Sequence, residues 1–207
     1  MYSAIFIASV IVLEIFLLVR MIFGATWRPA DPLSSKLVNE LSIRRANVDD
    51  AAAIREIYNF EVENETSTFD LVPRTLEVQQ AWIMERSGAF SVVVATTAGQ
   101  VVGFGALSVY RDRAAYSTTV EDSLYVSRAF SRQGIGRAIL EHLLDVADAS
   151  GFHSVMARIG AAGIGSRAVH EACGFTLVGI EREVGRKFGR WLDVALMQCI
   201  LHERKRN

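Results

Sequence analysis

The spacing of hydrophobic residues predicts strands and helices that alternate from residue 41 onward. In the stretch 122–150, a β-type apolar run and a short polar loop precede apolar residues at steps of three and four: Ile135, Ile139, Leu140, Leu143, Leu144 and Ala147. Steps of three and four place side chains on one face of an α-helix. This stretch therefore predicts a strand that leads into the N-terminus of a long amphipathic helix.

The same patterns predict an α+β domain with the element order β-α-α-β-β-β-α-β-α-β-β, and no repeat interrupts it. A helix near 52–58 is expected to be capped by Asn47 or Asp49, and a polar loop or broken helix follows over 64–74. Two strands form a hairpin around residues 98–100. The predicted strands cover 41–44, 91–96, 101–108, 116–126, 154–159, 176–183 and 191–200, and the further helices cover 76–86, 135–150 and 166–173.

The N-terminal segment is strongly apolar, with only Glu14 and Arg20 charged between residues 4 and 25. About 20 apolar residues can span a bilayer as a helix. Two interpretations stay open: a transmembrane anchor that leaves the domain on the cytoplasmic side, or an upstream extension from a mis-assigned start codon. A cleaved signal is less favoured because no basic n-region precedes the segment. The predicted parts are a hydrophobic segment (1–25), a linker (26–40), the domain (41–201) and a basic tail (202–207).

Composition excludes some classes of function. The 207 residues include 22 basic and 23 acidic side chains, a formal net charge of −1, so there is no electrostatic footprint for nucleic acid. Cys173 and Cys199 have neither metal-ligand spacing nor a disulfide framework and are expected in the core. We expect no metal.

The polar loop 131–136, with the sequence SRQGIG, has the features of an anion site. The first-turn N–H groups of a helix attract anions. Gly134 and Gly136 allow close approach of a ligand to the backbone, and Arg132 and Arg137 add positive charge. The loop suits a pyrophosphate, although an ordinary glycine-containing helix entry explains G-x-G equally well. It matches neither a Walker loop nor a dinucleotide fingerprint.

The run YVSRAFSRQGIGRAILEHLLDVADASGF resembles motif A of the GNAT superfamily of N-acetyltransferases. It departs from that motif at Ser131, where the family has Gln or Arg, and Gly163 stands where the family commonly has Asn. The resemblance implies a GNAT fold, a mixed central sheet with flanking helices, and acetyl-CoA as co-substrate. The residues implied to bind acetyl-CoA are Leu124, Tyr125, Val126, Arg132, Gln133, Gly134, Ile135, Gly136, Arg137 and Ser166.

A more specific resemblance extends over about 43–198. The run YSTTVEDSLYV is similar to the phosphinothricin and methionine sulfoximine acetyltransferase branch, in which the glutamate of this run is the proposed base. The resemblance therefore implies that Glu121 is the base. It also implies that His170 protonates the leaving thiolate or relays the amine proton. From the pattern alone, Glu121 is more simply a solvated carboxylate, and His170 could equally pack locally on its helix.

The same branch implies a pocket for the acidic end of a small amino-acid-like amine acceptor. Phe69, Tyr110, Arg111 and Arg113 match its wall and its basic segment, and 187–194 resembles its C-terminal strand entry. A guanidinium binds carboxylate or phosphinate with two hydrogen bonds. The predicted function is acetylation of phosphinothricin, methionine sulfoximine, methionine sulfone or a related amino acid. The alternatives are a protein N-terminus or polyamine as acceptor, or a membrane-tethered acyl-CoA-binding module without turnover. The resemblance also implies a homodimer.

Overall fold

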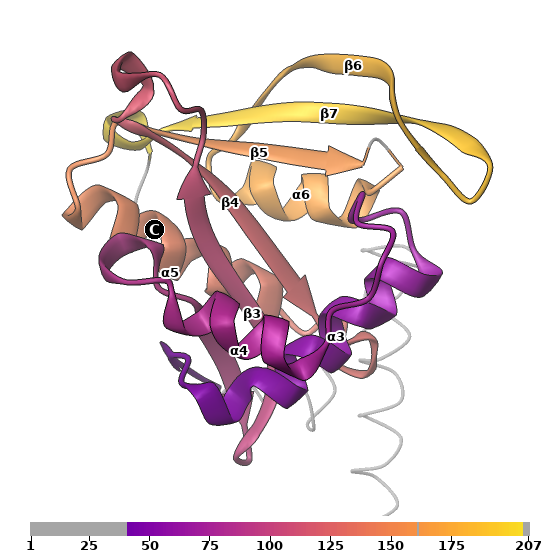
Figure 1. Ribbon diagram of the computed structural model, residues 1–207. Helices are drawn as coiled ribbons and strands as arrows, with labels where there is room; N and C mark the ends of the chain where they lie inside the picture. The colour runs from indigo at the N-terminus through magenta and orange to yellow at the C-terminus, as the bar shows by residue number, and fades with distance from the viewer. Residues whose placement is uncertain (1–40, 161, 205–207) are drawn as a thin grey trace, which may run out of the picture. The chain divides into compact units, whose positions relative to one another are not determined.

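The fold is a seven-stranded mixed sheet with helices on both faces (Figure 1). The computed structural model describes residues 41–160 and 162–204. The strands lie in the order β1-β2-β3-β4-β5-β7-β6. The predicted sequence of elements is confirmed, and their bounds are β1 (Ser42–Arg45), α3 (Ala51–Asn64), α4 (Leu76–Met84), β2 (Val93–Thr97), β3 (Gln100–Val109), β4 (Thr119–Val126), α5 (Ile135–Ala149), β5 (Ser154–Gly160), α6 (Ile164–Ala172), β6 (Thr176–Lys187) and β7 (Arg190–Ile200).

The central strands β4 and β5 run parallel but pair along only a short stretch. Thr119, Val120 and Glu121 of β4 are in register with residues 154–156 of β5, and the pairing ends there. Beyond Glu121 the two strands diverge, as Figure 1 shows. We call the opening between residues 122–126 of β4 and 157–160 of β5 the fork. Along the fork, the edge of β4 that faces β5 has no strand partner within the described residues.

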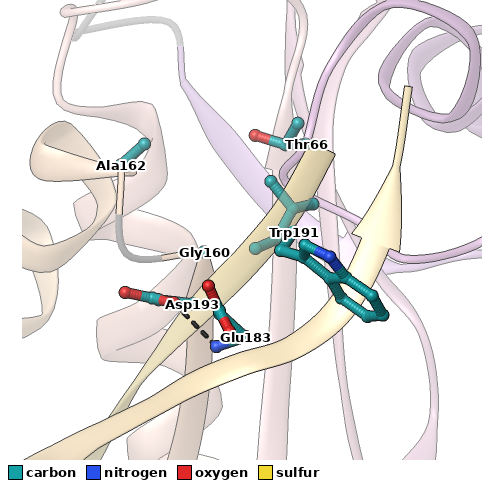
Figure 2. A pocket seen from close by; sticks show the side chains of 7 residues that line it. Thr66, Gly160, Ala162, Glu183, Trp191 and Asp193 are labelled. Atoms are coloured by element: carbon teal, nitrogen blue, oxygen red, sulfur yellow. Dashed lines mark hydrogen bonds between the residues drawn. The ribbon is translucent and has the colours of Figure 1, made fainter. Parts of the chain in front are cut away.

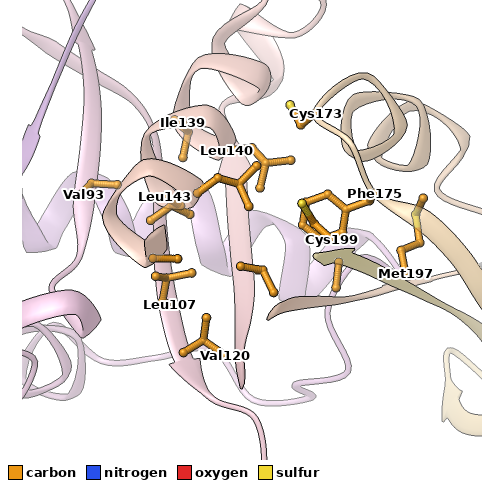
Figure 3. Packing of buried hydrophobic residues seen from close by; sticks show 14 of the residues in the cluster. Val93, Leu107, Val120, Ile139, Leu140, Leu143, Cys173, Phe175, Met197 and Cys199 are labelled. Carbon is orange, nitrogen blue, oxygen red and sulfur yellow. The ribbon is translucent and has the colours of Figure 1, made fainter. Parts of the chain in front are cut away.

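Two hydrophobic clusters fill the two faces of the sheet. The apolar stripe of α5 packs on β3 and β4 in the cluster of Figure 3, and α3 packs on the opposite face with Phe104 and Val94. Gly105 lets α5 approach closely, because a Cβ there would lie 2.7 Å from the Ile139 side chain. This close packing fixes the N-terminus of α5 relative to the end of β4.

Two predicted strand boundaries are wrong by a few residues. The long strand begins at Thr119 rather than 116, because residues 114–116 form a 3-10 turn. Helix α5 begins at Ile135 as predicted, so the last two residues of the stretch 131–136 lie in its first turn. Strand β6 runs on to Lys187 and forms a hairpin with β7 through Phe188 and Gly189, both at positive φ. Asn47 does provide the predicted cap, for the 3-10 turn that precedes α3.

Predictions for both ends of the chain lie outside the described residues. This applies to the hydrophobic helix within 1–25, the linker 26–40 and the last three residues of the basic tail. Within 41–160 and 162–204, no helix is both long and apolar enough to cross a membrane.

Candidate active site

The glycine loop between β4 and α5 presents an uncapped helix N-terminus. Gly134, which directly precedes α5, adopts the left-handed conformation at φ 81°, and no side chain caps the first turn. The 15-residue helix α5 therefore directs first-turn N–H groups and the positive end of its dipole towards the loop. This arrangement fits the diphosphate of a coenzyme.

Only some of the polar side chains in and next to the loop make hydrogen bonds to other described residues. Arg132 is exposed and itself has a positive φ of 64°. The Nε of Arg137 donates to Glu141 Oε1 at 2.8 Å, and both side chains are exposed. The Oε1 of Gln133 is buried and has no hydrogen-bond partner among the described residues. A ligand at this loop could bind the exposed guanidinium of Arg132 and could share that of Arg137 with Glu141.

Glu121 lies at the base of the fork. It is the last residue of β4 that pairs with β5, opposite Met156, and its partner on β3 is Ser108. The side chain is partly buried, and desolvation raises the pKa of its carboxyl above the ordinary value. The charge of Arg158 opposes this shift in pKa, whereas Asp122 and Glu181 add to it. A carboxylate with a raised pKa is a better match for proton transfer near neutral pH.

His170 is enclosed and held at both ring nitrogens. Its exposed fraction is 2%, its Nε2 lies 3.1 Å from Asp122 Oδ2, and its Nδ1 lies 2.7 Å from the backbone oxygen of Ser166. Burial alone would lower the pKa of His170, but the hydrogen bond and charge of Asp122 outweigh it, so the pKa is raised. Since both partners are acceptors, the doubly protonated ring satisfies both contacts. The geometry fits a residue that fastens α6 to β4.

Asp122 is a site residue that sequence reasoning did not single out. Along β4 it shares a face with Val120 and Leu124, which pack in the core. A carboxylate on an apolar strand face needs a buried partner. That mismatch was the available signal, but the sequence could not identify His170, 48 residues away, as the partner.

A cavity of about 270 Å³ opens beside the end of β5 (Figure 2). Within it, Glu183 has a positive φ of 52° at an irregularity in the β6–β7 ladder, and its N–H donates to Asp193 Oδ1 at 2.8 Å. Sequence reasoning named none of the lining residues as site residues, although Trp191, Leu192 and Asp193 fall in the segment 187–194. The lining residues are Thr66, Gly160, Ala162, Glu183, Trp191, Leu192 and Asp193.

The predicted acceptor residues lie outside this cavity. Phe69 covers Gly185 of β6, where an added Cβ would collide with its ring. The Arg111 guanidinium lies 5.0 Å from the ring centre of Tyr110 and 5.6 Å from that of Tyr116, and Arg113 is exposed. This segment precedes β4, whereas the glycine loop follows it, so the length of an eight-residue strand, about 26 Å, separates them. Glu121 lies nearer the arginine end.

Packing explains the glycine at position 163. A Cβ there would lie 2.9 Å from the Gly160 backbone oxygen and 3.1 Å from the Ile159 side chain. The Gly163 N–H also donates to that oxygen at 2.7 Å. An asparagine at this position would therefore require the connection between β5 and α6 to move. Ser166, in the first turn of α6, is exposed and remains available to a ligand.

Comparisons with known proteins agree with this architecture. Residues 43–196 match the family model described as an acetyltransferase (GNAT) domain. The chain is 38% identical to a phosphinothricin N-acetyltransferase of Streptomyces viridochromogenes over 161 residues, 76% of this chain and 86% of the relative. It is 36% identical to an L-methionine sulfoximine/L-methionine sulfone acetyltransferase of Pseudomonas aeruginosa over 162 residues, 77% and 94% of the two chains.

Comparison with solved structures also finds acetyltransferases. A GNAT phosphinothricin acetyltransferase from Sinorhizobium meliloti, in complex with acetyl-CoA, superposes with a TM-score of 0.72 at 36% identity, covering 78% of this chain and 88% of that one. An acetyltransferase from Salmonella typhimurium with its cofactor acetyl-CoA gives a TM-score of 0.76 at 35% identity, covering 80% and 96%. The resemblance found in the sequence is confirmed. The chain belongs to the GNAT acetyltransferase family and is an acetyl-CoA-dependent N-acetyltransferase.

Proposed function

We propose that this enzyme acetylates the α-amino group of a small amino-acid-like acceptor by direct attack within a ternary complex. The observation that carries the proposal is the position of Glu121. It stands where β4 and β5 part, on the strand that leads to the glycine loop, and its pKa is raised. The relatives named for phosphinothricin and for methionine sulfoximine indicate the class of acceptor.

The chain offers two surfaces for acetyl-CoA. The uncapped first turn of α5, with Arg132 and Arg137, would hold the diphosphate. The free edge of β4 at Leu124, Tyr125 and Val126 would pair with the pantetheine arm as an added strand does. Gln133 and Gly134 shape the loop, Ile135 and Gly136 contribute first-turn amides, and Ser166 lies across the fork. When bound, acetyl-CoA supplies an activated thioester.

Glu121 would act on the acceptor amine. An α-ammonium group with a pKa near 8 is mostly protonated at neutral pH and must lose a proton before it can attack. The Glu121 carboxylate takes that proton, directly or through a water molecule. The backbone N–H of Val126, which faces the fork, would stabilise the negative charge that develops on the acetyl oxygen, whereas the register with β3 turns the N–H of Tyr125 towards that strand.

We assign His170 a positioning role. A thiol with a pKa of about 8.5 leaves without a strong acid, and the two hydrogen bonds of the His170 ring occupy both of its nitrogens. Protonating the thiolate from this ring would require it to give up one of them. By accepting from Nδ1, the Ser166 carbonyl ties the first turn of α6 to β4 through His170 and Asp122.

Two regions of the structure are candidates for binding the part of the acceptor that lies beyond its reacting amine. Phe69, Tyr110, Arg111 and Arg113 remain the proposed set for an acidic group, and Tyr110 lies two residues from Ser108, the β3 partner of Glu121. The cavity instead offers two carboxylates and an indole, which suit a cation. This observation favours a second candidate function, acetylation of a polyamine or another acceptor with a second positive charge.

A panel of acceptors separates these functions. We expect thiol release from acetyl-CoA to be at least about tenfold faster with methionine sulfoximine or phosphinothricin than with spermidine or an N-terminal peptide. The Arg111→Gln/Arg113→Gln variant should lose this preference, and the matched Glu183→Gln/Asp193→Asn variant should keep it. Faster release with spermidine, abolished in the second variant, would establish the polyamine function instead. Coenzyme A binding without thiol release for any acceptor would contradict both.

A further inference from the structure

Lys187, the last residue of β6, is a buried cation that the proposed chemistry does not use. Its exposed fraction is 3%, and its Nζ donates to the backbone oxygen of Glu61 at 3.1 Å and to that of Thr68 at 2.9 Å. Glu61 lies on α3, and Thr68 lies in the loop after it. A single side chain from the β6–β7 hairpin therefore links the end of α3 to the loop 65–70.

The side chain of Glu61 makes the next link. It is also buried and accepts two hydrogen bonds from Arg128, to Oε1 and Oε2, each at 2.8 Å. The Ser67 hydroxyl donates to the same Oε2. Arg128 belongs to the 3-10 turn between β4 and the glycine loop. Glu61 thus joins the loop 65–70 to the approach to the glycine loop.

These contacts hold a wall of the cavity in place. Thr66, which lines the cavity, stands beside Ser67 and two residues from Thr68, both of which are hydrogen-bonded in this way. The opposite wall is close: a Cβ on Gly160 would lie 3.1 Å from the Thr66 backbone oxygen. A shift of the loop by 1 Å would therefore change the cavity directly.

We propose that Lys187, Glu61 and Arg128 form one positioning unit, which sets the acceptor-side wall and the approach to the cofactor loop together. None of the three needs to touch the reacting atoms. The kinetic part of this inference rests on the proposed function, because it assumes that the acceptor binds beside the loop 65–70. The structural part, that the three side chains hold the loop 65–70 in place, does not depend on the proposed function.

The variants are chosen to remove contacts and keep volume. Lys187→Met removes both hydrogen bonds of Lys187. Glu61→Gln removes the negative charge of the ion pair with Arg128, and Ser67→Ala is a milder change at an exposed position. Asp50→Asn is the matched control, because Arg44 and Asp50 form a similar two-bond ion pair with side-chain exposures of 44% and 7%, against 50% and 6% for Arg128 and Glu61. That pair lies at the other end of α3.

Two readouts distinguish positioning from a general loss of stability. In Lys187→Met and Glu61→Gln, hydrogen exchange of the amides in 65–70 should rise about tenfold or more, while Asp50→Asn leaves this segment unchanged. The KM for the acceptor should rise about 10- to 100-fold with a smaller change in the KM for acetyl-CoA. Ser67→Ala should show the same pattern at reduced size.

Exchange in 65–70 that stays at the wild-type level in Lys187→Met and Ser67→Ala would overturn the proposal, whatever the kinetics. Equal loosening of this segment by Asp50→Asn would also overturn it, because the effect would then be general. If the wild-type enzyme acetylates no amine in the panel, the proposed function fails, and the exchange experiment still decides the positioning unit.

Discussion

Replacing Glu121 by glutamine is expected to lower kcat/KM for the acceptor about 100- to 10,000-fold and to leave acetyl-CoA affinity within about twofold. Glutamine keeps the size of the side chain but cannot accept a proton. Steady-state kinetics measure kcat/KM, and calorimetric titration with acetyl-CoA in the absence of acceptor measures the affinity. Glu56→Gln, the same change at an exposed position on α3, provides a control for the loss of one carboxylate. Unchanged turnover in Glu121→Gln with coenzyme A binding intact would remove Glu121 from the role of base.

The pH dependence of the wild-type enzyme gives the same prediction a second readout. Only the deprotonated carboxylate is a base, and desolvation raises the pKa of Glu121. As the pH is lowered, kcat/KM should therefore begin to decrease at a pH above the ordinary glutamate pKa of about 4.3, which gives an acidic limb in the pH profile. In Glu121→Gln this limb should be absent from the residual activity.

Replacing Asp122 by alanine is expected to destabilise the fold by about 3–5 kcal/mol, because it leaves the buried His170 without its carboxylate partner. Denaturant unfolding measures the change. Asp145→Ala, which removes an exposed partner of Arg204, should cost less than about 1 kcal/mol. A loss in Asp122→Ala no larger than in this control would show that the buried pair does not hold α6 on β4.

The sign of the pH dependence follows from the raised pKa of His170. The pair's contribution to stability is fully present below the unfolded pKa of about 6.5, and it is lost as the pH rises through the folded pKa. The difference in unfolding free energy between wild type and Asp122→Ala should therefore shrink at alkaline pH. A difference that grows with pH would contradict a raised pKa.

The parts of the site that follow local sequence rules could be predicted. The three- and four-residue spacing in α5 located the helix, and the glycine before it located the uncapped N-terminus. The resemblance of the run YSTTVEDSLYV to one branch of acetyltransferases identified Glu121 as the candidate base. The family resemblance then supplied the reaction, which periodicity alone could not.

The parts that depend on tertiary contacts could not be predicted. Lys187 looked like a charge at a strand end, but the fold buries it against two backbone carbonyls from residues more than 100 positions earlier. Nothing in the sequence singled out Glu61, and only the packing of α3 brings Arg128 to it. The cavity likewise depends on the irregularity in the β6–β7 ladder at Glu183, where a non-glycine residue takes a positive φ.

Direct transfer at the fork is tested most directly by the initial-velocity pattern. Rates of thiol release would be measured at several fixed acetyl-CoA concentrations while the best acceptor of the panel is varied, and the N-acetylated product identified by mass spectrometry. Direct attack on the thioester with Glu121 as base predicts intersecting double-reciprocal lines and no acetylated enzyme. Parallel lines, together with an acetyl group trapped on the protein in the absence of acceptor, would contradict it.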